Sequence, residues 1–364
     1  MAKRKISPEE ENKRQGKLKL KEYPYTYARI CAMRAKLIKK DAYSKLLKMK
    51  LSEIAKFLQD TEYKKEIDEL GSDYSGVSLI ENALNVNLLR TSLKLKRITE
   101  DKNLAELIDA YAMRRDIWNI KTILRARHSR QKEEDIKSLV MPTGKLDESF
   151  FTDLSKKESV EEIVRSLNFI RFDNLKEAVH SYKEKKSLFE LENAIDHDYY
   201  SYLLEFAKRM PKQGLFFREF VENEIDMLNL RVMLRLKKEK ANKREIKRYL
   251  FYPGAKLGPQ ELNRLSEADD LGSMIKSLSK EGYGKISREL EKSKDSIIMM
   301  ELKLNKFLLD RAALLLHQHP LSIEVILGYM LAKEIEIRNL KTIIKGKQLG
   351  MKEEFIESQL VIGG

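Results

Sequence analysis

Apolar residues recur along much of the chain at the three- and four-residue spacing of an amphipathic helix. One such face is lined by Ile117, Ile120, Ile123 and Leu124, and the same pattern returns across residues 335–344. Alternation of apolar and polar positions, which would predict β-strands, does not extend over any useful length. The pattern therefore predicts an all-α protein.

Comparison of the chain with itself reveals a heptad that occurs three times. The copies are Asn119-Ile-Lys-Thr-Ile-Leu-Arg125, Asn229-Leu-Arg-Val-Met-Leu-Arg235 and Asn339-Leu-Lys-Thr-Ile-Ile-Lys345, with successive asparagines 110 residues apart. An acid–isoleucine pair precedes each copy, at Asp116-Ile117, Glu224-Ile225 and Glu334-Ile335. We interpret the heptads as corresponding helices of an internal repeat.

Two further markers occur in the same order and at the same period. Upstream of the three heptads lie Glu81-Asn-Ala-Leu-Asn85, Glu192-Asn-Ala-Ile-Asp196 and Glu301-Leu-Lys-Leu-Asn305. Pairs of leucines form the other marker, at Leu46/Leu58, Leu154/Leu167 and Leu265/Leu278. Proline and glycine stand together in two of the intervening segments, as Pro142-Thr-Gly144 and Pro253-Gly254.

The repeat predicts three small helical domains of similar structure. We place them at residues 25–135, 136–248 and 249–364, after a charged N-terminal tail at residues 1–24. A period near 110 residues is far above that of solenoid repeats, which favours separate domains over a continuous superhelix.

Asparagine is a mediocre helix former, so its return at one point of three predicted helices needs a reason. A buried amide could hold one packing arrangement by hydrogen bonding, which would make Asn119, Asn229 and Asn339 structural residues. Alternatively, the three amides could line a shared central feature. The structural interpretation is favoured.

Basic residues follow each asparagine. Cations near helix C-termini complement the helix dipole, which accounts for part of this excess. Their recurrence also favours a docking surface for an acidic partner over simple solvation. The candidate docking residues are Arg125, Arg127, Arg130, Arg244, Lys247 and Arg248.

Composition agrees with long helices and few turns, because the chain has only 15 glycines and 7 prolines. Its formal net charge of +14 indicates acidic partners such as nucleic acid, an anionic membrane surface or an acidic protein, although some proteins are simply rich in lysine. Cys31 is the single cysteine, which excludes an intramolecular disulfide. No stretch is long and apolar enough to predict a transmembrane helix.

A search for catalytic chemistry yields no candidate. His317 and His319 are the only histidines close in sequence, and residues two apart on a helix point in different directions. Gly144-Lys145 and Gly346-Lys347 lack the other residues of a phosphate-binding loop. We therefore expect no catalytic residue, no cofactor and no metal site.

The start of the predicted body carries a family resemblance. Tyr25-Thr-Tyr27-Ala-Arg29 followed by Arg34-Ala-Lys-Leu37 resembles the opening of the C subunit of archaeal A-type ATP synthases, a relative of the d subunit of V-type ATPases. The threefold order of the asparagine and Glu-x-x-Leu helices is also similar to that family. The similarity extends over residues 23–364 and leaves only the charged tail unmatched.

The resemblance implies a funnel-shaped all-α body of three domains related by pseudo-threefold symmetry. It implies a non-catalytic rotor component of a proton- or sodium-translocating ATP synthase, located peripherally on the cytoplasmic face of the membrane. Its expected partners in that complex are the D and F subunits of the central stalk and the proteolipid ring of K subunits. No nucleic acid is expected in that complex.

An alternative from another class is a basic helical scaffold that binds RNA or another polyanion. Such a scaffold would show RNA affinity that falls steeply with salt.

Overall fold

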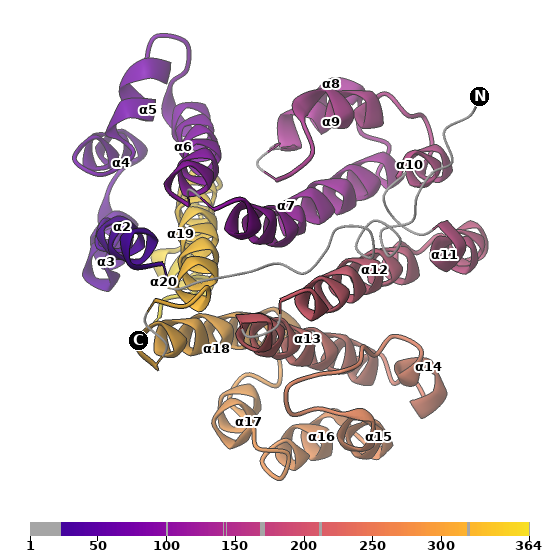
Figure 1. Cartoon of the computed structure of the whole chain (residues 1–364). Coiled ribbons are helices and arrows are strands. Elements are labelled where there is room, and N and C mark those ends of the chain that lie inside the picture. The colour runs from indigo at the N-terminus through magenta and orange to yellow at the C-terminus, as the bar shows by residue number, and fades with distance from the viewer. Residues whose placement is uncertain are drawn as a thin grey trace. The chain divides into compact units, whose positions relative to one another are not determined.

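The computed structural model describes residues 23–99, 101–140, 142, 144–167, 172–210, 213–318 and 321–363. The predicted tail at residues 1–24 lies outside this part of the chain except for its last two residues. Within it every regular element is a helix, which confirms the predicted all-α class (Figure 1).

The first group of helices runs to the first heptad, and its members are α2 (Pro24–Arg34), α3 (Lys40–Lys48), α4 (Leu51–Gln59), α5 (Lys64–Leu70), α6 (Gly76–Ile98) and α7 (Lys102–His128). A second group leads to the second heptad, with α8 (Glu133–Leu139), α9 (Glu148–Ser155), α10 (Val160–Ser166), α11 (Phe172–Lys185), α12 (Phe189–Lys208) and α13 (Gln213–Lys238). The third comprises α14 (Lys243–Lys247), α15 (Pro259–Glu267), α16 (Leu271–Ser277), α17 (Gly284–Glu291), α18 (Ile297–Gln318), α19 (Glu324–Gln348) and α20 (Glu353–Ser358).

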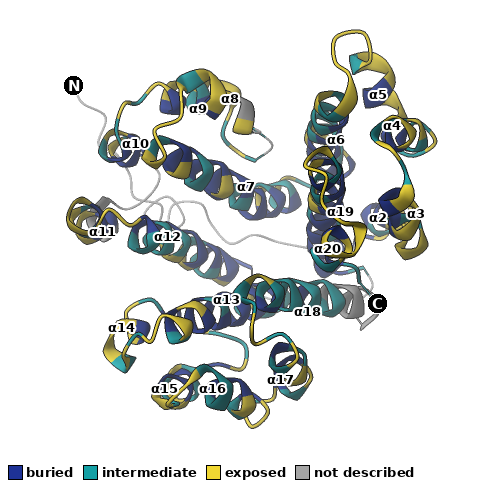
Figure 2. Ribbon diagram, turned by 180° about the vertical axis from the view of Figure 1, so that it is seen from behind, coloured by how far each residue is buried: buried dark blue, intermediate teal, exposed yellow. Residues whose placement is uncertain are grey.

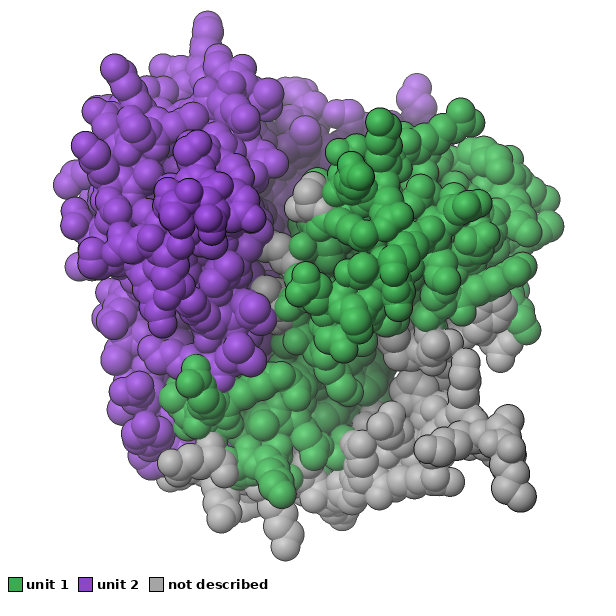
Figure 3. Space-filling model, turned by 90° about the horizontal axis from the view of Figure 1, so that it is seen from above, with its two compact units in different colours: residues 1–21, 95–221 green, residues 22–94, 222–364 purple. Residues whose placement is uncertain are grey.

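The chain divides into two compact units (Figure 3). Of the described residues, unit 1 contains those from 95 to 221, and unit 2 contains those from 23 to 94 and from 222 to 363. Unit 2 is thus assembled from two stretches that are far apart in sequence. The three domain boundaries predicted from the repeat remain a prediction.

Each unit is built on long helices that carry most of the buried residues (Figure 2). In unit 1, α7 packs against α12, and the Tyr199 hydroxyl donates a hydrogen bond to the backbone oxygen of Tyr111 at 3.0 Å. In unit 2, a core cluster combines buried residues 43–88 with residues 337–356. This core cluster of unit 2 therefore needs α3–α6 and α19–α20 together.

The three heptad helices α7, α13 and α19 end in the same way. The second residue after each end has a positive φ, namely 58° at Arg130, 59° at Lys240 and 65° at Gly350. The next N–H then reaches back to a carbonyl in the last turn, as from Met351 to Gly346 at 2.9 Å. This left-handed turn satisfies helix-end carbonyls and redirects the chain into the short helices α8, α14 and α20.

Candidate functional site

The asparagine of each heptad lies buried in the middle of a long helix. Asn229 donates to the backbone oxygen of Phe251 at 3.0 Å and accepts from its N–H at 2.8 Å. Asn339 makes the same pair of hydrogen bonds with Val361, at 2.8 and 2.9 Å. Both asparagines thus fix the chain 22 residues further on to the helix that carries them.

Asn119 is 1% exposed and has polar contacts of its own. The residue 22 positions after it, Met141, lies outside the described residues. Two of the three asparagines thus have the geometry of packing residues, and the alternative of a shared polar lining remains a prediction.

A buried carboxylate lies one helical turn before each asparagine, at Asp116, Asp226 and Glu336. Asp116 accepts hydrogen bonds from the backbone N–H groups of Lys145 and Leu146, at 2.7 and 3.2 Å. Asp226 accepts from the N–H groups of Lys256 and Leu257, at 2.8 and 3.2 Å. In α13 the carboxylate and the asparagine therefore bind successive parts of one connecting segment.

These carboxylates explain the glycines next to the prolines of the repeat. A Cβ atom on Gly144 would overlap the carboxylate of Asp116, and one on Gly254 would overlap Asp226. Only glycine lets the backbone come this close to the acid.

The carboxylates of Asp116 and Asp226 differ in one partner. The Tyr283 hydroxyl donates to Asp226, whereas the Oδ1 atom of Asp116 is buried with no hydrogen-bond partner among the described residues. Five residues after the second leucine of each pair, the sequence has Tyr63, Phe172 and Tyr283. By this spacing Phe172 corresponds to Tyr283, and a phenylalanine has no hydroxyl to donate to Asp116.

Burial raises the pKa of both acids. It raises the pKa of Asp116 to about 7, against the two backbone N–H groups that favour the carboxylate. Burial also raises the pKa of Asp226, where the Tyr283 hydroxyl acts in the opposite direction together with the backbone N–H groups.

Cations that follow each asparagine pair with the upstream marker of another repeat. Arg125 binds Glu192 at 2.6 Å, and Lys121 binds Asp196 at 2.6 Å. Equivalent pairs join Arg235 with Glu301 at 2.5 Å, Arg231 with Asn305 at 3.1 Å, and Lys345 with Glu81 at 3.0 Å. The two sequence markers of the repeat are therefore the two sides of one helix–helix contact.

A third cation on each long helix binds a backbone oxygen in the last turn of a short helix. Arg127 donates to the oxygen of Ser155 at 2.7 Å, Lys237 donates to that of Ser266 at 2.9 Å, and Lys347 donates to that of Leu47. Cations at these positions favourably face the negative end of the helix dipole. We use the term contact set for the polar residues of one heptad helix that bind other segments. It comprises the buried acid, the asparagine, and the cations that bind the upstream marker or the end of a short helix.

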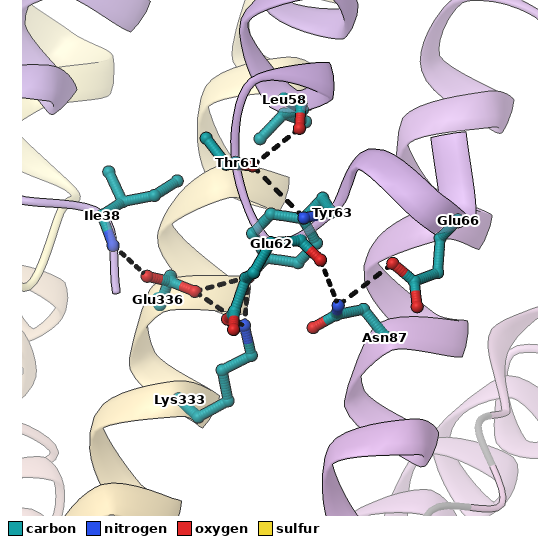
Figure 4. A network of polar contacts seen from close by, with 9 residues as sticks. All are labelled: Ile38, Leu58, Thr61, Glu62, Tyr63, Glu66, Asn87, Lys333 and Glu336. Carbon is teal, nitrogen blue, oxygen red and sulfur yellow. Dashed lines mark hydrogen bonds and ion pairs between the residues drawn. The ribbon is translucent and has the colours of Figure 1, made fainter. Parts of the chain in front are cut away.

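Apart from Asn339, the contact set of α19 binds the beginning of the chain. The N–H of Ile38 donates to the Glu336 carboxylate at 2.5 Å, and the Tyr63 hydroxyl donates to the same group at 2.5 Å. Lys333, which has no exposed surface, contacts Glu336 at 2.9 Å, the Tyr63 oxygen at 2.8 Å, and Glu62 (Figure 4). These residues join α19 to the segment between α2 and α5.

This buried network shifts the titration of its members. Burial raises the pKa of the Glu62 carboxyl, and the neighbouring Lys333 ammonium opposes that shift. Burial also raises the pKa of the Tyr63 hydroxyl, with a further contribution from the negative charge of Glu336. The phenol therefore remains a hydrogen-bond donor to Glu336.

The candidate docking residues fall into two groups. Arg125 and Arg127 bind within their own unit, as described above. Arg130, Arg244, Lys247 and Arg248 are exposed, and among the described residues no carboxylate lies within ion-pair distance of them. A docking role for any of the six stays a prediction.

Two properties of the described residues concern metal binding and membrane spanning. In that part of the chain no group of three or more His, Cys, Asp or Glu is placed to hold a metal ion. None of its helices combines the length and the apolar character needed to cross a membrane. The side chain of His317 and all of His319 lie outside the described residues.

Sequence reasoning assigned two of the three acids to the wrong register. The acid–isoleucine pairs place Glu224 and Glu334 in the repeat, but the equivalent carboxylates are Asp226 and Glu336. Alignment of the acids three residues before each asparagine finds them, since residues three apart share one helix face whereas residues five apart, such as Glu224 and Asn229, do not.

A model of the ATP synthase (C/AC39) subunit family matches residues 26–359. The chain is 36% identical over 344 residues to the A-type ATP synthase C subunit of Methanococcoides burtonii, covering 93% of this chain and 94% of that protein. The corresponding C subunits of Haloferax volcanii and Archaeoglobus fulgidus are 34% and 32% identical, with 93% of this chain and 97% and 96% of theirs covered.

Proposed function

This chain belongs to the ATP synthase (C/AC39) subunit family and is an ATP synthase subunit, and from that premise we propose that it is a non-catalytic rotor component of an A-type enzyme. In this role it links the D and F subunits of the central stalk to the proteolipid ring of K subunits. It lies peripherally at the cytoplasmic face of the membrane and couples rotation to ion flow.

The observation that carries the proposal is the extent of the family match, which includes all three heptad helices. The contact sets support it. A part that transmits torque needs resistance to deformation, and buried hydrogen bonds and ion pairs hold each long helix to elements distant in sequence. None of these contacts requires a reacting group.

Reconstitution of the complex tests the proposal. The full chain is expected to purify with the D and F subunits and the proteolipid ring in mild detergent. A complex assembled without it should hydrolyse ATP in its catalytic head but should not pump ions, and addition of the chain should restore pumping. A chain that remains a monodisperse monomer in the presence of all three partners would overturn the proposal.

A further inference from the structure

The three turns that follow the heptad helices share a backbone but differ in charge. Ile136, Ile246 and Ile356 occupy equivalent positions in α8, α14 and α20, and each is buried. Each isoleucine packs the buried side of its short helix against the protein, and the opposite side of that helix is exposed. The turns at residues 128–138, 238–248 and 348–358 can therefore be compared position by position.

Only the turn at residues 238–248 is strongly basic. It contains six Lys and Arg against two acids, whereas residues 128–138 contain three of each and residues 348–358 contain one base and three acids. The equivalents of Arg244 and Lys247 in the last turn are Glu354 and Glu357. A general excess of lysine in the protein does not account for this difference.

Four of the six cations of this turn are available to a partner, while Lys238 and Lys243 bind Asp295 and Glu267. Lys240, Arg244, Lys247 and Arg248 are exposed, and among the described residues none of them has a carboxylate within ion-pair distance. Arg244, Lys247 and Arg248 are spaced so that they share one side of the chain, away from buried Ile246. One of the two acids, Glu245, is engaged with the N–H of Asn242 at 2.8 Å.

Buried residues hold the segment that follows the turn. Asn229 fixes both backbone groups of Phe251, and Phe251 and Leu250 are buried. The next residue, Tyr252, is 44% exposed and stands beside the cations in sequence. A neutral tyrosine next to several cations suits the boundary between lipid headgroups and water.

We propose that the turn at residues 238–248 is a docking surface for an anionic lipid bilayer. Its cations would contact the headgroup phosphates, each contributing to binding without a shaped pocket. The inference rests on the proposed function for its setting beside a membrane.

A lipid surface fits this turn better than a protein or a nucleic acid. Protein interfaces gain most of their affinity from large apolar or aromatic side chains in their centre, and residues 238–248 expose none. Single-stranded nucleic acid binds basic surfaces that also offer several aromatic rings for base stacking, and here only Tyr252 is near. By contrast, a charged bilayer needs only the exposed cations.

Vesicle flotation with the full chain tests the proposal. The chain is expected to float with vesicles of phosphatidylcholine and phosphatidylglycerol, and not with phosphatidylcholine alone. The combined change Arg244→Ala, Lys247→Ala and Arg248→Ala should lower the partition coefficient on the order of 100-fold, at about fivefold for each cation. Circular dichroism and thermal melting establish that the variant is folded, and Gln replaces Ala at the same positions if it is not.

The equivalent turn provides a matched control. Arg130→Ala, Lys132→Ala and Lys137→Ala remove the same number of positive charges from that turn and should leave vesicle binding close to that of the unmodified chain. Three results would overturn the lipid site. The two triple variants could lose vesicle binding equally, the unmodified chain could fail to float with anionic vesicles, or RNA could displace the chain from the vesicles. Intact assembly with the D and F subunits and the ring in any of those cases would leave the proposed function standing.

Discussion

At the scale of single residues, the repeat is most informative where it is imperfect. Asp116 and Asp226 occupy the same place before their asparagines and bind the same two backbone N–H groups of a connecting segment. Within the described part of the chain a hydroxyl reaches Asp226, from Tyr283, and none reaches Asp116. The buried carboxylate of Asp116 therefore has less compensation for its lost hydration.

This difference predicts a pH-dependent effect of Asp116→Asn. The native pKa of Asp116 is about 7, above the ordinary value of 3.8. Between these values the native state binds a proton that the unfolded state lacks, so the free energy of unfolding falls as pH rises. Asparagine does not ionise in this range. The free energy of unfolding of the variant, relative to that of the parent chain, should therefore rise by about 3 kcal/mol from pH 5 to pH 8. Urea denaturation at the two pH values measures this difference.

Asp226→Asn is the matched control. The hydroxyl of Tyr283 favours the ionised form of Asp226, so this variant should gain less on the same rise in pH. Parallel pH dependence of Asp116→Asn and the parent chain would contradict the account of Asp116.

At the scale of elements, the contact sets explain why sequences 110 residues apart resemble each other. Each long helix presents an acid, an amide and cations that bind separate neighbouring segments. Asn339 and Asn229 bind segments 22 residues further along, in both cases through the N–H and the carbonyl of one residue.

Asn339→Ala should detach one segment locally. The change leaves the N–H and the carbonyl of Val361 buried without their partner, at a cost of about 2–3 kcal/mol. Hydrogen exchange at the Val361 amide should therefore become faster. Asn229→Ala should have this effect at Phe251 and leave Val361 unchanged, and the two variants thus serve as controls for each other. Unaltered exchange at both amides would show that the asparagines do not hold these segments.

The long helices could be predicted from sequence because their apolar spacing and repeated heptads depend only on local order. The partners of those helices could not. Arg125 remains a candidate docking residue, and its guanidinium also binds Glu192. The sequence does not reveal this ion pair, because a repeated cation and a repeated acid look solvated until their helices are placed side by side. The close approach of Gly254 to Asp226 likewise depends on tertiary structure.

At the scale of the whole molecule, the sequence repeat and the packing partners do not follow the same divisions of the chain. The contact set of α7 binds the segments that come after it, up to α12. In α19 the acid and the cations bind the beginning of the chain instead, and only Asn339 binds a segment that follows. The core of unit 2 accordingly combines residues 43–88 with residues 337–356. The boundaries drawn at residues 135 and 248 can be tested against this arrangement.

Fragments of the chain provide that test. Residues 101–210 contain α7 to α12 with their mutual contacts and should unfold cooperatively in urea. Residues 249–364 contain α19 with α18 and α20 but without α3–α6. This fragment should not unfold cooperatively alone, because the core cluster that α19 shares with α3–α6 would be half exposed. Addition of residues 23–94 should restore a cooperative transition to residues 249–364. Cooperative unfolding of residues 249–364 alone would favour the boundaries drawn from the repeat.

The union of distant segments in unit 2 also has a consequence for biosynthesis. A ribosome that has produced residue 88 must add 249 further residues before residue 337 is available to complete the core cluster. At about 5–20 residues per second, this takes roughly 10–50 s. During that interval the apolar faces of α3 to α6 lack their final cover, and chaperones that bind nascent chains would find their main target there.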